Sequence, residues 1–252
     1  MRKKSNSDDL LQALFARLDL VQRDNVKPIR KIAIFSTPRS GSTHFCNALS
    51  NTQKMGEPLE WFNNRFFDNY LSYFKKKDFK LVDYIDFIFT KTSSDSGTFS
   101  TKILVEQYLY FLNVHKFDLL SLNFDEIILV DRRDKIAQAY SYSKALVTDQ
   151  WTSLSKSYVN LNPVNIKNSS ILKSLYHIAT WEEFFESHLS NKLNFRYTYE
   201  DFIKSKNFPL EVLNDLKISV ASKESFKFDL QKQTTQDDLL RIKEFRKSLK
   251  LN

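Results

Sequence analysis

The 252-residue sequence contains very little glycine and almost no cysteine. Gly41, Gly56 and Gly97 are its only glycines, where ordinary usage would give roughly 18. Because glycine is used so sparingly, each one indicates a tight turn or a close backbone approach. The single cysteine, Cys46, excludes an intramolecular disulfide and suits a reducing compartment.

Metal-ligand clusters and long hydrophobic runs are also missing. One cysteine and four histidines without ligand spacing predict no metal site. No stretch of about 18 apolar residues exists that could form a membrane span. The basic start, Met1–Lys4, is followed by Asp8 and Asp9 instead of the apolar run of a signal peptide. We therefore expect a cytoplasmic protein without stable membrane insertion.

The formal net charge is +8, and hydrophobic residues make up 42% of the chain, enough for a sizeable core. The positive charge suits general solubility, or it suits an anionic ligand such as nucleic acid, an acidic membrane surface or a polyphosphorylated nucleotide. Charge alone does not choose among these, so the motifs must.

Four short hydrophobic runs alternate with segments of helical periodicity. Strands are predicted at 31–36, 99–104, 126–131 and 193–198. Helices are predicted at 7–21, from about 42 to 49, within 61–91, and at 134–147, 171–189 and 237–249, with a loop at 160–170. Strands separated by helices predict an α/β protein with a central parallel sheet flanked by helices. We expect one domain over 1–252, with residues 1–28 as an N-terminal helical extension.

The polar turn after the first predicted strand has the features of an anion cradle. A helix that starts at the carboxyl end of a strand points free N–H groups and the positive end of its dipole toward a ligand. The candidate anion-binding residues are Arg39, Ser40, Gly41, Ser42 and Thr43. The turn is no Walker A loop, because it lacks the second glycine and the lysine. A plain capped helix start is the competing interpretation.

A second candidate anion site follows the predicted strand at 126–131. Arg133 lies at the strand end, and Ser141 follows eight residues later along a helix. An anion between them could accept hydrogen bonds from the guanidinium and the hydroxyl together. Two exposed arginines at a helix start are the alternative, although a cation there opposes the helix dipole.

These segments share their order and spacing with a known enzyme family. The segments are Pro38–Thr43 (PRSGST), Gly56–Phe62 (GEPLEWF), Arg133–Ser141 (RDKIAQAYS) and Gln150-Trp151. Together they resemble the sulfotransferases that use 3′-phosphoadenosine 5′-phosphosulfate (PAPS), most closely the bacterial trehalose- and lipopolysaccharide-type carbohydrate sulfotransferases. The resemblance covers roughly residues 32–246 and implies a P-loop-like sulfotransferase fold.

The resemblance implies a role for each matched residue. The cradle residues would grip the phosphosulfate, and Arg133 and Ser141 would hold the 3′-phosphate. Glu60 would be the general base, and Lys102 would bind the acceptor or the bridging oxygen, or else occupy a strand edge. His44 is the rival base. No metal is implied.

The acceptor implied by the resemblance is a carbohydrate or a glycolipid, with no nucleic-acid partner, and a homodimer is compatible with it. Trp61, Phe62 and Trp151 suit either sugar stacking or core packing. Lys232-Gln233 stands where the family often has Arg-Gln, which leaves its cofactor contact open. Two other functions compete: a non-catalytic basic nucleotide- or RNA-binding protein, and a P-loop-like kinase.

Overall fold

Four parallel strands form the centre of the protein in a computed structural model that describes residues 6–21, 27–151, 166–205, 207–219 and 234–249. The strands are β1 (Arg30–Ser36), β2 (Thr98–Leu104), β3 (Glu126–Asp131) and β4 (Phe195–Thr198), and their order in the sheet is β2-β1-β3-β4. Every neighbouring pair is parallel. The α/β class is confirmed, and all four predicted strands end at the residue that the sequence indicated.

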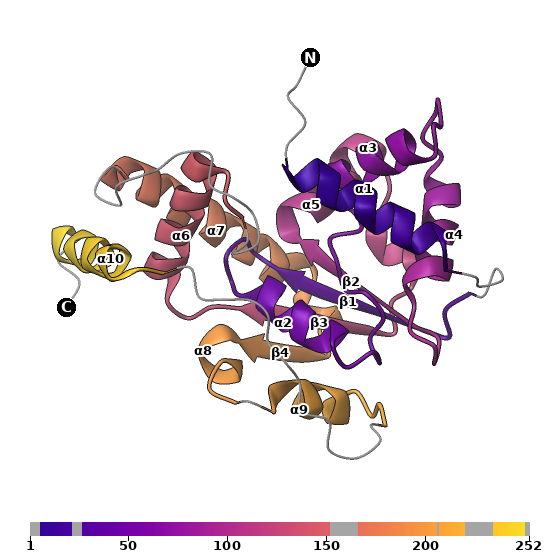
Figure 1. Ribbon diagram of the computed structural model, residues 1–252. Coiled ribbons are helices and arrows are strands. Elements are labelled where there is room, and N and C mark those ends of the chain that lie inside the picture. Colours follow the sequence, from indigo (N-terminus) through magenta and orange to yellow (C-terminus); the bar gives the residue numbers. More distant parts are fainter. Residues whose placement is uncertain (1–5, 22–26, 152–165, 206, 220–233, 250–252) are drawn as a thin grey trace.

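Helices fill the connections between the strands (Figure 1). The long ones are α1 (Asn6–Asp19), α2 (Ser42–Ser50), α3 (Asn64–Tyr73), α4 (Leu81–Thr92), α6 (Lys135–Thr148), α7 (Asn168–His188), α9 (Phe208–Asp215) and α10 (Gln236–Ser248). Short turns of helix are α5 (Val105–Tyr110), η1 (Phe111–His115), η2 (Leu119–Leu122), η4 (Ser190–Lys192) and α8 (Tyr199–Phe202). None of the described helices combines the length and the apolar character that a membrane crossing requires.

Two predictions of local structure need correction. The sequence analysis missed α9, whose eight residues are too few for a clear helical period. The predicted loop at 160–170 ends early, because α7 begins at Asn168. Residues 160–165 of that loop lie outside the described part of the chain.

Alternating side chains of β1 point to opposite faces of the sheet, as the pleat of a strand requires. Ala33 and Phe35 pack in a large cluster with side chains of α1, α3, α4, α5 and α7. Ile32 and Ile34 pack on the other face, where α2 and α9 cover the sheet. Figure 1 shows these two helical layers on either side of the strands. Burial on both faces explains why the strands read as continuous hydrophobic runs.

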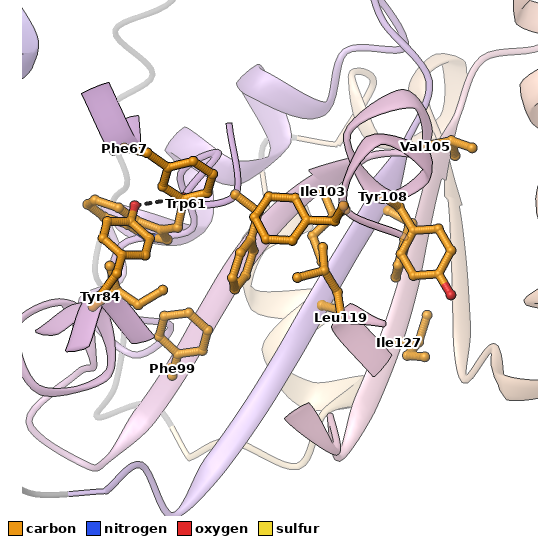
Figure 2. Packing of buried hydrophobic residues seen from close by; sticks show 14 of the residues in the cluster. Trp61, Phe67, Tyr84, Phe99, Ile103, Val105, Tyr108, Leu119 and Ile127 are labelled. Carbon is orange, nitrogen blue, oxygen red and sulfur yellow. Dashed lines mark hydrogen bonds between the residues drawn. The ribbon is translucent and has the colours of Figure 1, made fainter. Parts of the chain in front are cut away.

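The larger cluster is strongly aromatic (Figure 2). The Tyr84 hydroxyl donates a 2.6 Å hydrogen bond to the Trp61 carbonyl oxygen, and the rings of Phe67 and Tyr84 meet edge to face with centroids 4.8 Å apart. Trp61 is fully buried and Phe62 is 1% exposed. Both residues therefore pack in the core, and the sugar-stacking interpretation of them is wrong.

The carboxyl ends of the strands lie at one edge of the sheet. Ser36 at the end of β1 is level with Leu104 of β2 and Val130 of β3, and Asp131 is level with Thr198 of β4. The loop before α2, the start of α5, the segment before α6 and the start of α8 therefore meet at this edge. In open α/β sheets this is where ligands bind.

Candidate functional site

The loop between β1 and α2 has an unusual backbone. Arg39 and Gly41 have φ angles of 62° and 88°, both in the left-handed region. A Cβ atom on Gly41 would lie 2.3 Å from a ring carbon of Tyr199, so only glycine fits there. The buried hydroxyls of Ser36 and Ser42 join the two ends of the loop by a 2.9 Å hydrogen bond. The loop thus presents the N-terminal amides of α2 at the ligand-binding edge.

A buried glutamine fixes the loop from outside. Gln138 of α6 is fully buried, and its Nε2 atom donates 2.8 Å hydrogen bonds to the Thr37 hydroxyl and the Pro38 carbonyl oxygen. Both acceptors belong to the loop, so α6 and the loop are positioned together. This explains why the glutamine belongs to the motif that the sequence analysis singled out.

A cavity of about 660 Å³ opens beside the loop, within the usual size range of small-molecule sites. Five of the residues predicted to bind the anionic ligand line it: Arg39, Gly41, Ser42, Thr43 and Ser141. Ser40 does not, because it is fully buried; its hydroxyl has no hydrogen-bond partner within the described residues. One face of α6 forms a wall with Ala137, Tyr140, Ser141, Lys144, Ala145 and Thr148, which recur at helical spacing.

Arg39 joins the two predicted anion sites. Its Nε atom donates a 2.9 Å hydrogen bond to the Ser141 hydroxyl, and another guanidinium nitrogen donates to the Trp151 carbonyl oxygen. Burial, together with the positive charge of Arg132, lowers the Arg39 pKa to about 10. Arg39 therefore stays charged at neutral pH in a partly dry, electropositive setting, which favours an anion.

The structure places Arg132, and not Arg133, at the cavity. The Arg133 side chain is 55% exposed and forms an ion pair with Asp201 at 2.5 Å, and it does not line the cavity. Arg132 does line it: its guanidinium lies 5.0 Å from the ring centroid of Tyr199. The Arg132 Nε atom is buried and has no hydrogen-bond partner among the described residues, although Glu200 lies 4.0 Å away. An unsatisfied buried donor of this kind suits an anionic ligand.

Positive charge predominates around the cavity. The lining cations in the described part of the chain are Arg39, Arg132, Lys144, Lys243 and Arg246, and the lining carboxylates are Asp134 and Asp238. Asp238 binds Lys144 at 2.7 Å, and Asp134 binds Arg246 at 2.6 Å. Sequence reasoning missed Lys243 and Arg246 because α10 is far along the chain, and it also missed Lys144 on α6. The helical spacing of Ser141, Lys144 and Ala145 could have indicated Lys144.

Glu60 and Lys102 meet in a second polar cluster next to the loop. Lys102 Nζ lies 2.8 Å from Glu60 Oε1 and donates a 2.8 Å hydrogen bond to the Thr43 hydroxyl. Glu60 Oε2 accepts hydrogen bonds from Gln107 at 2.6 Å and from Asn63 at 3.0 Å. Lys102 thus connects the predicted base, Glu60, with Thr43 of the anion cradle. Asn63 and Gln107 were not predicted.

The surroundings of Glu60 keep it ionised. Burial alone would raise the Glu60 pKa. The charge and hydrogen bond of Lys102, together with the hydrogen bonds from Asn63 and Gln107, outweigh this effect, so the Glu60 pKa lies below its ordinary value. Its side chain is still 24% exposed. A carboxylate that is held by three donors yet open to one side can accept a proton from an incoming hydroxyl.

The segment before Glu60 is fixed to β2. The Leu59 carbonyl oxygen accepts a 2.9 Å hydrogen bond from the Lys102 amide and a 3.2 Å one from the Thr101 hydroxyl. Gly56 has a φ of 65°, and a Cβ atom there would lie 2.3 Å from the Thr92 carbonyl oxygen. The glycine therefore permits a close backbone approach that places Glu60 beside Lys102.

His44, the rival base, lines the cavity. Its ring stacks on Phe202 with centroids 6.2 Å apart, and burial lowers its pKa. It is therefore neutral at neutral pH. Trp151 lines the cavity and is 36% exposed, so its contact with a sugar stays a prediction. Lys232-Gln233 lies outside the described residues.

Comparison with models of known protein families identified a match. A family model described as Stf0 sulphotransferase matches residues 32–248. No curated protein matches the chain. The matched region includes the β1–α2 loop, Glu60, Lys102 and the whole of β2, β3 and β4.

Proposed function

The chain belongs to the Stf0 sulphotransferase family and is a sulfotransferase, and from this premise we propose that it transfers the sulfuryl group of PAPS to a hydroxyl of a carbohydrate or glycolipid, with Glu60 as the general base. The observation that carries the proposal is the chain of contacts Glu60–Lys102–Thr43, which connects a carboxylate to an anion cradle. A cytoplasmic location and a homodimer stay predictions.

The cavity residues fit a nucleotide with phosphates at both ends. The loop amides, with Arg39, Ser42 and Thr43, would hold the 5′-phosphosulfate. Arg132, with its unsatisfied Nε atom, and Ser141 are suited to the 3′-phosphate, the group that distinguishes PAPS from ATP. Arg133 suits this role less, because Asp201 already occupies its guanidinium.

Glu60 would accept the hydroxyl proton of the acceptor as the hydroxyl oxygen attacks sulfur. The new O–S bond forms in line with the S–O bond that breaks, whose electron pair goes to the leaving phosphate. Lys102 contacts both Glu60 and Thr43, so its ammonium can offset the charge that develops on the leaving oxygen. PAPS would supply the sulfuryl group and its own leaving group.

The test is single-turnover transfer from ³⁵S-labelled PAPS to a panel of sugars that includes trehalose. We expect Glu60→Gln to lower the transfer rate by roughly 10²–10⁴-fold, while the binding of adenosine 3′,5′-bisphosphate stays within about twofold of wild type. His44→Gln is the matched control and should retain most of the rate. A large loss in the His44 variant with normal transfer by the Glu60 variant would assign the base to His44 instead.

The competing functions predict different ligand-binding results. A kinase would need magnesium and would bind ATP as tightly as the bisphosphate. An RNA-binding protein would bind RNA and show no preference for a 3′-phosphate. Either result would contradict PAPS as the donor.

A further inference from the structure

Glu106 is a carboxyl group at the start of α5 that the proposed mechanism does not use. It is the second residue of α5, directly after β2, and its Oε2 atom is buried without a hydrogen-bond partner within the described residues. A buried polar atom without a partner costs free energy of folding. An unexplained cost of this kind often marks a residue that is kept for binding or catalysis.

The neighbours of Glu106 belong to the polar cluster and to the cavity rim. The next residue, Gln107, donates to Glu60, and the charge of Glu60 acts directly on Glu106. On α6, the charge of Glu106 contributes to raising the Tyr142 pKa, after burial, to about 12. The Tyr142 ring lies 6.1 Å from that of Trp151, which lines the cavity. Glu106 thus neighbours both the candidate base and the aromatic rim.

The protonation state of Glu106 differs from that of Glu60. Burial and then the negative charge of Glu60 raise the Glu106 pKa to about 8, against smaller opposite effects of its own backbone N–H and Lys102. The group is therefore mostly a neutral acid at pH 7. A neutral carboxyl has one O–H donor and can also accept, as a sugar hydroxyl requires.

Glu60 has room for only one hydroxyl. A carboxylate offers about four lone-pair directions, and donors from Lys102, Asn63 and Gln107 take three of them. A second hydroxyl of the same acceptor must find a different partner. The Oε2 atom of Glu106 has no hydrogen-bond partner within the described residues and is available for it.

We infer that Glu106 is a specificity-determining residue that hydrogen-bonds a second hydroxyl of the acceptor, so that the enzyme selects polyhydroxylated acceptors over simple alcohols. The inference rests on the proposed function, because it assigns Glu60 to the reacting hydroxyl. Glu106 touches a hydroxyl that does not react, and no bond forms or breaks there.

A structural role and a binding role predict opposite effects on stability. Glu106→Leu removes an unsatisfied buried oxygen, so we expect its urea midpoint to equal or exceed that of wild type. A structural carboxyl would give a lower midpoint. Glu106→Gln, close in shape, keeps a polar group and guards against misfolding of the leucine variant.

The experiment measures sugar binding without catalysis. Methyl α-D-glucopyranoside and its 2-, 3-, 4- and 6-deoxy analogues are titrated by NMR into the complex with adenosine 3′,5′-bisphosphate. The proteins are wild type, Glu106→Leu, Glu106→Gln and the control Glu183→Gln, which makes the same glutamate-to-glutamine exchange at an exposed position of α7. We expect Glu106→Leu to weaken binding of the parent glycoside by roughly three- to tenfold. One deoxy analogue should bind wild type and Glu106→Leu with the same affinity, because it lacks the hydroxyl that Glu106 binds.

Three results of the titrations with wild type and the Glu106 variants would overturn the inference. They are equal weakening of every analogue, no weakening of any, and no sugar binding by a wild-type protein that does bind the bisphosphate. Failure of the wild type to bind the bisphosphate would instead contradict the PAPS proposal, so the two failures are distinguishable. An equal loss in Glu183→Gln would show that the effect is not specific to Glu106 and would also overturn the inference.

Discussion

Arg39 and Ser141 are separated by 102 positions in the sequence, yet the arginine Nε donates a 2.9 Å hydrogen bond to the serine hydroxyl. The sequence analysis assigned them to opposite ends of one nucleotide. Their contact shows that the β1–α2 loop and α6 form one continuous wall of the cavity. A nucleotide bound in the cavity as we propose would contact both elements.

The first prediction concerns the pH dependence of transfer. Lys102 is the largest influence that lowers the Glu60 pKa, against the opposing effect of burial. Lys102→Met should therefore raise that pKa, and the acidic limb of the kcat/KM profile should move to higher pH. The measurement is the pH–rate profile of sulfuryl transfer by wild type and variant.

A neutral donor provides the control for this prediction. Gln107→Met removes a 2.6 Å hydrogen bond to Glu60 but no charge, so it should move the same limb in the same direction by less. An acidic limb that stays in place in Lys102→Met would show that Glu60 is not the titrating base.

The second prediction concerns two glycines with positive φ. At Gly56 a Cβ atom would meet the Thr92 carbonyl oxygen at 2.3 Å, whereas at Gly97 it would meet an Ile29 side-chain carbon at 3.0 Å. Both alanine variants should lose roughly 1–3 kcal/mol of unfolding free energy from backbone strain. Gly56→Ala should lose more than Gly97→Ala, because a backbone oxygen cannot move aside as a side chain can.

Urea unfolding monitored by circular dichroism checks this order. Gly56→Ala should also lower kcat, since the glycine positions the Glu60 segment. Equal destabilisation of the two variants would mean that the close approach at Gly56 does not constrain the fold.

The third prediction concerns Asp238, which is 1% exposed on α10. Burial alone would raise its pKa. Interactions with Lys144, the Thr235 amide and Tyr140 together outweigh this effect, so the Asp238 pKa lies below its ordinary value. Its contribution to stability is therefore present above the unfolded-state value of about 3.9 and is lost as pH falls through the lower folded-state value. Asp238→Asn should cost about 2–4 kcal/mol at pH 7, because it leaves Lys144 without its charge partner.

The pH dependence separates this charge effect from a packing effect. The stability difference between wild type and Asp238→Asn should shrink as pH falls below about 4. A difference that stays constant down to pH 2 would mean that the ionised form of Asp238 does not carry the stabilisation. Urea midpoints measured at several pH values decide the matter.

The sequence was sufficient to predict the sheet and the loop. Strands buried on both faces leave continuous hydrophobic runs, and Ser36 and Asp131 end two of them in polar turns. The spacing of Arg133 and Ser141 could not reveal which of two adjacent arginines faces the cavity. That choice depends on Asp201, 68 positions further along, which binds Arg133. Such tertiary pairing leaves no local signal.

The polar cluster was predicted only in part for a similar reason. Glu60 and Lys102 were found because the resemblance indicated them. Gln107 and Glu106 follow β2 directly, and their importance arises from the close approach of the Gly56 segment to β2. A six-residue helix such as α5 has no periodicity from which that approach could be predicted.

The most direct test of the account is calorimetric titration of adenosine 3′,5′-bisphosphate, AMP and ATP, without magnesium, into wild type, Arg132→Ala and Arg133→Ala. The account predicts that wild type prefers the bisphosphate, and that Arg132→Ala loses roughly tenfold or more of that affinity, as the loss of a charge-assisted hydrogen bond implies. Arg133→Ala should stay within about threefold of wild type. Equal binding of the three nucleotides by wild type, or a loss confined to Arg133→Ala, would contradict it.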